Sequence, residues 1–255
     1  MNLNFDLSLA HGYTRNSQKI RVMSEAWVAE NMFCPCCGNQ NIVRYENNRP
    51  VADFHCTACG EEFELKSKQG AIHTKIADGA YFTAIQRIES NKNPELLVLQ
   101  YQDSMVTNLT LIPKYFFTPS VVEKRRPLSQ TARRAGWIGC NILYNEIPRQ
   151  GKIPIIRDGH IIEKSVILAA YNKSKLLYTP DMHSRGWLFD VLQCINTVPG
   201  DCFTLADVYQ FTDSLARIHP DNHNIQPKIR QQLQILRDKG YLTFLGSGRY
   251  QKVNM

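Results

Sequence analysis

Residues 53–66 read Asp53-Phe54-His55-Cys56-Thr57-Ala58-Cys59-Gly60-Glu61-Glu62-Phe63-Glu64-Leu65-Lys66, and here a cysteine pair is followed directly by a strand pattern. From residue 62 onward apolar and charged residues alternate, which predicts an extended strand with Phe63 and Leu65 on one face. Glu64 and Lys66 then project together from the other face. The stretch therefore predicts a strand that carries a carboxylate and an amine side by side.

Asp53 adds a second carboxylate on an adjacent strand. Together Asp53 and Glu64 could hold one hard divalent cation, with Lys66 beside it. A site of this kind can polarise a phosphodiester, activate a water and neutralise the charge that develops during cleavage. A surface strand with alternating charges for solubility shows the same spacing, so the spacing alone leaves both interpretations open.

The cysteines around this stretch form two C-x-x-C pairs, Cys34 with Cys37 and Cys56 with Cys59, at a separation typical of a four-cysteine zinc site. Such a site leaves no open coordination position, so the zinc is expected to be structural and to contribute folding energy. Cys36 lies inside the first pair and is expected to take no part.

The chain has 255 residues, enough for one or two domains, and its 43% hydrophobic and 21% charged residues predict a globular protein. Lys and Arg number 30 against 23 Asp and Glu, and the resulting net charge of +7 favours a polyanion such as nucleic acid as partner. Residues 1–30 show no secretion signal, and no apolar run approaches the roughly 18 residues of a membrane span. We therefore expect a cytoplasmic protein with no membrane partner, in which eight cysteines serve as metal ligands or buried thiols.

The order of predicted elements points to the α/β class. Residues 17–30 have the apolar recurrence of an amphipathic helix with Ser17 as a possible cap, and residues 78–90 also look helical. Residues 96–101 are nearly all apolar, as in a strand buried on both faces, and residues 109–112 read as its neighbour. Helices and strands in this order predict a mixed sheet flanked by helices.

A basic stretch with an aromatic residue follows between residues 114 and 139. Its cations are suited to phosphate contacts, and the Trp137 indole could touch a methyl group in the major groove. A tryptophan in the hydrophobic core remains the alternative. The predicted DNA-contacting residues here are Arg125, Arg126, Arg133, Arg134 and Trp137.

From about residue 184 the pattern is that of three helices and a closing hairpin, which predicts a winged helix-turn-helix domain. The third helix, residues 225–239, buries an apolar stripe and leaves a polar face for the major groove, although a solvated face is the alternative. Predicted DNA contacts on this face are Lys228, Arg230, Gln231, Gln234 and Arg237, and those of the wing are Arg249 and Lys252.

The arrangement of Asp53 with Glu64-Leu65-Lys66 resembles the motif of PD-(D/E)xK nucleases, except that Ala52 stands in place of the motif's proline. Longer runs resemble the DpnI-type methyl-directed restriction endonucleases over nearly the whole chain; these are residues 46–54, 61–68, 78–81, 131–141, 184–187 and 228–239. The resemblance implies a PD-(D/E)xK mixed sheet flanked by helices in residues 1–182, with an inserted four-cysteine zinc ribbon at 34–59. A winged helix-turn-helix domain would occupy residues 183–255.

The same resemblance implies a type II endonuclease that cuts double-stranded DNA at GATC when the adenine carries an N6-methyl group. Asp53, Glu64 and the Leu65 carbonyl would bind Mg²⁺, Lys66 would orient the attacking water, and Trp137 would touch the methyladenine. A monomer without an obligate protein partner is expected.

Two other interpretations remain: a zinc-ribbon and winged-helix DNA-binding regulator without nuclease activity, and a repair nuclease of the same fold that reads DNA structure. Glu25 or Glu30 on the first helix could approach the site, but a solvated helix face is expected for both.

Overall fold

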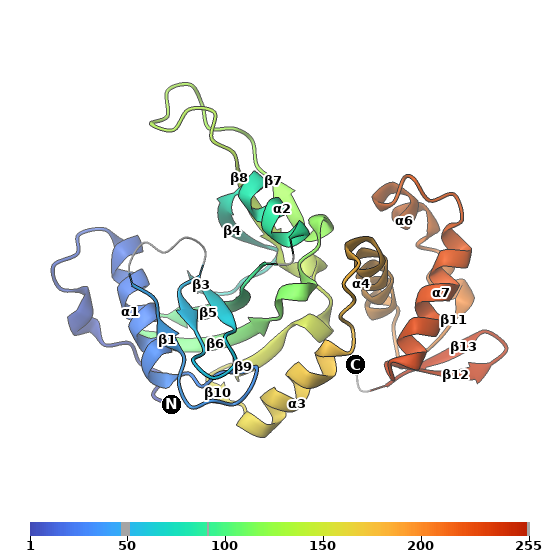
Figure 1. The fold of residues 1–255 in the computed structure, drawn as a ribbon, viewed down its shortest axis with the longest axis horizontal. Coiled ribbons are helices and arrows are strands. Elements are labelled where there is room, and N and C mark those ends of the chain that lie inside the picture. The colour runs from blue at the N-terminus through green and yellow to red at the C-terminus, as the bar shows by residue number, and fades with distance from the viewer. Residues whose placement is uncertain (47–51, 91, 254–255) are drawn as a thin grey trace.

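The computed structural model describes residues 1–46, 52–90 and 92–253. Residues 47–51 of the expected zinc insertion and residues 254–255 of the expected C-terminal domain lie outside the described part. Figure 1 shows a body built on β-sheets, which contains residues up to α3, and a mainly helical C-terminal domain beside it in orange and red. Within the described residues, no helix is long and apolar enough to cross a membrane.

The largest sheet has seven strands in the order β1-β2-β3-β5-β6-β9-β10. Strands β3 and β5 are parallel and the remaining neighbours are antiparallel, so the sheet is mixed, as predicted. The strands are β1 (Val43–Arg44), β2 (Phe54–His55), β3 (Glu62–Gln69), β5 (Glu95–Gln102), β6 (Met105–Ile112), β9 (Ile153–Arg157) and β10 (His160–Ile161).

Strand β5 separates two hydrophobic cores because its side chains alternate between the faces of the sheet. Leu97 and Leu99 belong to the core shared with α1 (Asn16–Asn31) and α3 (Lys164–Lys175). Leu96 and Val98 belong to the other core. All four are buried, which confirms the prediction of a strand covered on both faces.

A second sheet of three strands, in the order β4-β8-β7, stands next to the first. It contains β4 (Lys75–Ala80), β7 (Val122–Lys124) and β8 (Gly139–Leu143), and α2 (Tyr81–Glu89) follows β4 directly. The helix predicted from residue 78 therefore begins later than expected, because residues 75–80 pair with β8. The expected Ser17 cap is also wrong: α1 begins after Arg15, and no side chain caps it.

The C-terminal domain contains the predicted helix-turn-helix and wing. Its elements are α4 (Met182–Thr197), β11 (Cys202–Thr204), α5 (Leu205–Tyr209), α6 (Thr212–Ile218), α7 (Ile225–Asp238), β12 (Leu242–Gly246) and β13 (Arg249–Lys252). Residues 202–204 form a short strand that pairs with β13. Thr204 then caps α5 in a reciprocal capping box with Asp207.

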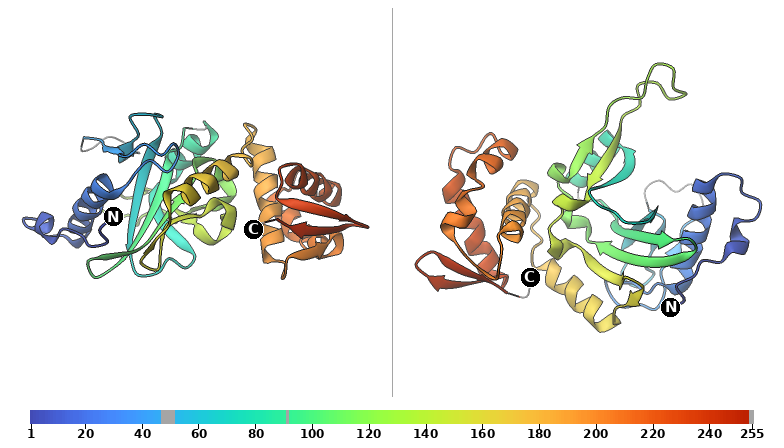
Figure 2. Two further views of the ribbon diagram at one scale, coloured as in Figure 1. Left: turned by 90° about the horizontal axis from the view of Figure 1, so that it is seen from below. Right: turned by 180° about the vertical axis from the view of Figure 1, so that it is seen from behind.

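Helix α4 joins the C-terminal domain to the body. The ring of Phe189 in α4 stacks on Phe116 of the body, with 4.5 Å between ring centroids. The side-chain amides of Gln150 and Asn196 exchange two hydrogen bonds of 3.0 Å. One hydrophobic core therefore runs from the body into the C-terminal domain, and Figure 2 shows the two packed side by side from two further directions. Short 3₁₀ helices complete the fold: η1 (Leu7–Ala10), η2 (Lys114–Phe116), η3 (Pro119–Val121), η4 (Tyr144–Glu146) and η5 (Arg149–Gly151).

Candidate functional site

Asp53 lies directly before β2 and against β3. Its backbone N–H donates to the carbonyl of Phe63 at 2.8 Å, and its Oδ2 accepts a hydrogen bond of 2.7 Å from the backbone N–H of Leu65. The antiparallel register that pairs Phe54 with Phe63 produces this placement. The structure thus places Asp53 next to Glu64 and Leu65 of β3, as the sequence spacing predicted.

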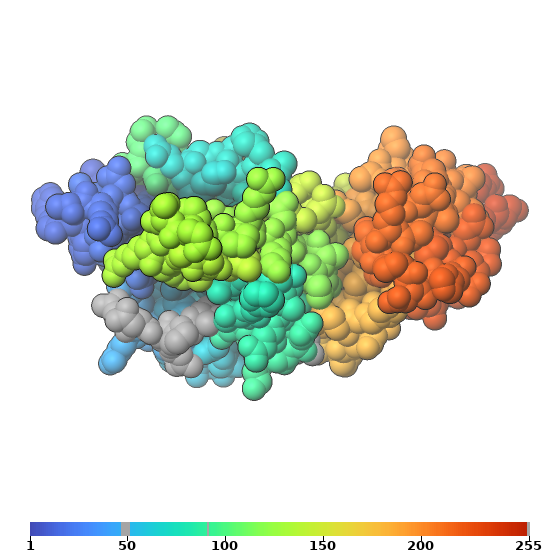
Figure 3. Space-filling model, turned by 90° about the horizontal axis from the view of Figure 1, so that it is seen from above, coloured from blue at the N-terminus to red at the C-terminus, as the bar shows by residue number. Residues whose placement is uncertain are grey.

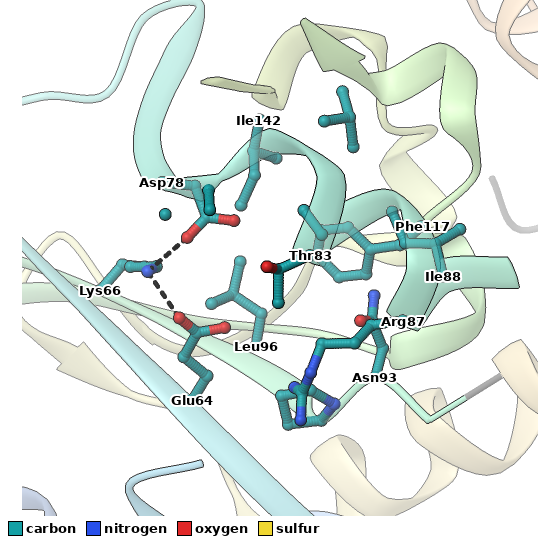
Figure 4. Close-up of a pocket in the computed structure, with 15 residues that line it drawn as sticks. Glu64, Lys66, Asp78, Thr83, Arg87, Ile88, Asn93, Leu96, Phe117 and Ile142 are labelled. Carbon is teal, nitrogen blue, oxygen red and sulfur yellow. Dashed lines mark ion pairs between the residues drawn. The ribbon is translucent and has the colours of Figure 1, made fainter. Parts of the chain in front are cut away.

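Glu64 and Lys66 project from the same face of β3, and Lys66 lies between two carboxylates. Its Nζ is 2.5 Å from Glu64 Oε1 and 2.6 Å from Asp78 Oδ1, as Figure 4 shows. Burial opposes the charge on Lys66, but the two carboxylates outweigh it and raise the pKa of Lys66 above its usual range. Burial also raises the pKa of Glu64. The charge of Lys66 lowers this pKa, but the charges of Asp78 and Asp53 raise it further, and the pKa stays above its usual value.

Sequence reasoning missed the contribution of Asp78. A helix was predicted at this residue, and a helical Asp78 could not be placed relative to β3. The residue lies on β4, in the second sheet. The available signal was its position inside one of the runs that carry the family resemblance.

Beside these charges is a cavity of about 270 Å³ that is open to solvent. Its apolar lining includes Leu96 and Ile142, and its polar lining includes Arg87 in the last turn of α2. Arg87 Nη1 is buried and has no hydrogen-bond partner among the described residues. Burial lowers the pKa of Arg87, while the charges of Glu64 and Glu62 favour its charged form. The cavity thus combines carboxylates, an ammonium and a guanidinium.

The helix carboxylates behave differently from each other. Glu30 is exposed, as expected. Glu25 is only 4% exposed and pairs with Arg21 at 2.6 Å and Arg44 at 2.5 Å, so a solvated face is wrong for this residue. It lines a hollow with Leu65, and therefore lies on the face of β3 opposite Glu64 and Lys66.

The four predicted cysteine ligands form a compact cluster. All four Sγ atoms lie within 4.8 Å of one another, and the Cys34–Cys59 and Cys37–Cys56 pairs are each 3.7 Å apart. A tetrahedron with Zn–S bonds of about 2.3 Å needs sulfur atoms about 3.8 Å apart, so the cluster is compatible with structural zinc. Cys36 is buried outside the cluster, as expected.

The predicted basic stretch forms a long loop between β7 and β8. In Figure 1 this yellow-green loop extends away from the sheets, and in Figure 3 it forms a ridge on the upper face. Its four predicted arginines are exposed: Arg125, Arg126, Arg133 and Arg134.

Trp137 is half-buried at the foot of this loop and belongs to neither hydrophobic core, so the alternative of a core tryptophan is excluded. The Arg134 guanidinium lies 4.4 Å from the centre of its ring. The indole edge lies so close to Gly139 that a Cβ there would be 2.8 Å from two ring carbons. The ring is therefore fixed where the loop joins the second sheet.

On α7 the predicted apolar stripe is buried and the polar face is open. Ile225, Ile229, Leu233 and Leu236 pack inward. Four of the five predicted DNA-contacting residues are exposed, namely Arg230, Gln231, Gln234 and Arg237, and Lys228 is half-buried.

Of the two DNA-contacting residues predicted in the wing, one is exposed and the other is buried. Arg249 is exposed, whereas Lys252 is only 8% exposed and donates a 2.5 Å hydrogen bond to the Val198 carbonyl. Side chains of β13 alternate between outside and inside, so Lys252 shares the inner face with Tyr250. The predicted phosphate contact of Lys252 is therefore wrong, and the two-residue period was the signal that could have shown it.

Comparison with protein-family models gives matches over nearly the whole chain. The model of DpnI, described as the Dam-replacing family, matches residues 1–180. The model of the Dam-replacing HTH domain matches residues 183–252. These matches indicate, at the level of the family, a restriction endonuclease with DNA as its partner. The chain belongs to the DpnI family of methyl-directed restriction enzymes.

Proposed function

We propose that the protein is a type II restriction endonuclease that hydrolyses double-stranded DNA at GATC sites carrying N6-methyladenine, in a Mg²⁺-dependent reaction. The observation that carries this proposal is the hydrogen bond that holds Asp53 against β3, next to Glu64 and Lys66, which line an open cavity. A DNA-binding regulator has no need of such a group. The PD-(D/E)xK motif supplies the assignment of roles.

Asp53, Glu64 and the carbonyl of Leu65 offer the oxygen ligands that Mg²⁺ prefers. The fit rests on charge: Asp53 and Asp78 both raise the pKa of Glu64, so these carboxylates repel one another and a cation would relieve the repulsion. When bound there, Mg²⁺ would stabilise negative charge on the phosphate and lower the pKa of a bound water.

Lys66 serves in this proposal as a fixed positive charge. Because its pKa is raised by two carboxylates, Lys66 stays protonated near neutral pH and is a poor general base. Its ammonium can donate hydrogen bonds that orient the attacking water and can stabilise charge on the phosphate.

Recognition is assigned to two surfaces. The exposed arginines of the β7–β8 loop would bind phosphates and base edges, with Trp137 against the methyl group of the adenine. The polar face of α7 would enter the major groove, and Arg249 would bind a phosphate. Residues 1–182 would form the catalytic domain and residues 183–255 the winged-helix domain of a monomer.

The test uses one plasmid prepared with and without adenine methylation at GATC. Purified protein with zinc retained is incubated with each form in Mg²⁺, and the ends of any fragments are sequenced. Cleavage of the methylated form alone, at GATC, is the expected result. Cleavage of both forms would remove the methyl requirement, and binding without cleavage would replace the nuclease with a regulator.

A further inference from the structure

We infer that Asp78 is a positioning residue of the nuclease site, which holds the Lys66 ammonium in place from the second sheet. The inference rests on the proposed function and adds to it a residue outside the Asp53, Glu64 and Lys66 motif. Lys66 belongs to β3 of the seven-stranded sheet and Asp78 to β4 of the three-stranded sheet. Their ion pair of 2.6 Å therefore joins the two sheets at the cavity.

The carboxylate of Asp78 is held from two sides. Oδ1 faces Lys66 Nζ, and Oδ2 lies 3.8 Å from the thiol of Cys140, whose backbone pairs with Asp78 across β4 and β8. Its side chain is only 17% exposed, compared with 23% for Lys66. The carboxylate thus has a defined orientation inside the site.

The backbone at Asp78 is shaped to aim this side chain. The register between β4 and β8 shifts between Asp78 and Ala80, so Gly79 is an extra residue in the ladder. Such bulges often direct a side chain near an active site. The bulge is followed at once by α2, which places Arg87 on the same cavity.

Asp78 differs from Glu64 in having no other role in the proposed reaction. Glu64 also contacts Lys66, but in the proposed function its carboxylate binds the divalent cation. Asp78 binds no metal in that proposal, so its contact of 2.6 Å can restrain the long, flexible side chain of Lys66.

A role of Asp78 as a third metal ligand is the competing explanation. Among the described residues, the four cysteines are the one group of three or more possible ligands whose atoms lie within 4.8 Å of one another. Asp53, Glu64 and Asp78 therefore do not form such a group. The geometry favours the contact with Lys66.

The experiment measures single-turnover cleavage of a methylated GATC duplex by the full chain near neutral pH. We expect Asp78→Asn to slow cleavage roughly 100-fold, the scale of a misplaced catalytic group. Asp78 binds neither DNA nor metal in this proposal. We therefore expect DNA affinity without Mg²⁺ to stay within about twofold of the wild type, and likewise the Mg²⁺ concentration that gives half the maximal rate.

The matched control is Glu123→Gln, which removes an ion pair of 2.6 Å to Lys75 from the same small sheet, away from Lys66. It should cleave like the wild type. Asp78→Glu keeps the carboxylate and should recover much of the lost rate. Thermal melting shows whether each variant is folded. If Asp78→Asn unfolds, the comparison of Asp78→Glu with Asp78→Ser replaces it.

A wild-type cleavage rate in folded Asp78→Asn would overturn the inference while leaving the nuclease intact. An increase in the required Mg²⁺ would overturn it in favour of a metal ligand. If the wild type does not cut methylated DNA, the proposed function itself fails, whatever the variants show.

Discussion

At the scale of single residues, the proposed chemistry depends on Asp53 and Lys66. We expect Asp53→Ala and Lys66→Ala to reduce the cleavage rate by at least about 1000-fold, because each removes charge from the reacting centre. Binding to methylated duplex in the absence of Mg²⁺ should change little. Gel-shift and cleavage assays on the same protein samples measure both quantities, and a variant that still cuts at the normal rate would contradict the assignment.

Trp137 gives a separate residue-scale prediction. If the indole contacts the methyl group, Trp137→Ala should lower the preference for methylated over unmethylated duplex roughly 10-fold, the scale expected for one small apolar contact. Affinities for both duplexes are compared, with Trp137→Phe as the control that keeps an aromatic ring against Gly139. An equal loss on both duplexes would refute a methyl-specific role.

Contacts between single residues could be predicted only where the two partners lie close together in the sequence. Asp53 and Glu64 could be paired from spacing, since one antiparallel turn of chain brings them together. Asp78 could not, because its partner Lys66 belongs to a different sheet and no local pattern records the contact. The prediction for Lys252 is wrong although the burial of Tyr250 two residues earlier sets its face.

At the scale of elements, the wing carries one proposed DNA contact, Arg249, and one buried cation with a structural role, Lys252. Arg249→Ala should weaken DNA binding and reduce the slope of log affinity against log salt by about 1, because one phosphate contact is lost. Lys252→Ala should leave that slope unchanged and lower the free energy of unfolding by about 1–3 kcal/mol, because it removes a buried hydrogen bond to Val198. Titrations at several salt concentrations and urea unfolding test the pair, and the reverse pattern would contradict it.

Elements with strong periodicity were predictable, whereas short strands without an apolar pattern were not. Strand β5 and helix α7 follow from apolar runs and stripes that any fold must bury. Strand β4, by contrast, has the sequence Lys-Ile-Ala-Asp-Gly-Ala, whose strand propensity is low. It is a strand because β8 provides hydrogen-bond partners. The two-residue strand β1 was missed for the same reason.

At the scale of the whole molecule, the cysteine cluster lies next to the proposed nuclease site. Strands β1 and β2 lie between the two cysteine pairs, and Asp53 directly precedes β2. Loss of zinc should therefore loosen this edge of the sheet and displace Asp53. We expect Cys59→Ser to lose bound zinc, to melt more than about 5 °C lower and to cut poorly even in excess Mg²⁺.

Cys202→Ser is the control, because Cys202 is an exposed thiol outside the cluster. Zinc content, melting temperature and cleavage rate are measured on both variants. Unchanged zinc content and melting in Cys59→Ser would contradict a structural metal site at the four cysteines.

The contact between the body and the C-terminal domain decides whether the two unfold together. One core crosses this contact, and Phe189 packs inside it with 3% exposure. The amide pair of Gln150 and Asn196 closes the same contact from the side. Because neither part can open here without exposing apolar surface, a single cooperative transition is expected for the whole chain.

Phe189→Ala should lower the free energy of unfolding by about 3–5 kcal/mol, the usual cost of a cavity of this size, and should destabilise both parts of the chain. Phe244→Ala, at a ring that is 46% exposed in the wing, should change it by less than about 0.5 kcal/mol. Hydrogen exchange followed by mass spectrometry reports opening in each part separately. If Phe189→Ala loosened the C-terminal domain and left exchange in β5 unchanged, the two parts would unfold independently, contrary to the single transition expected here.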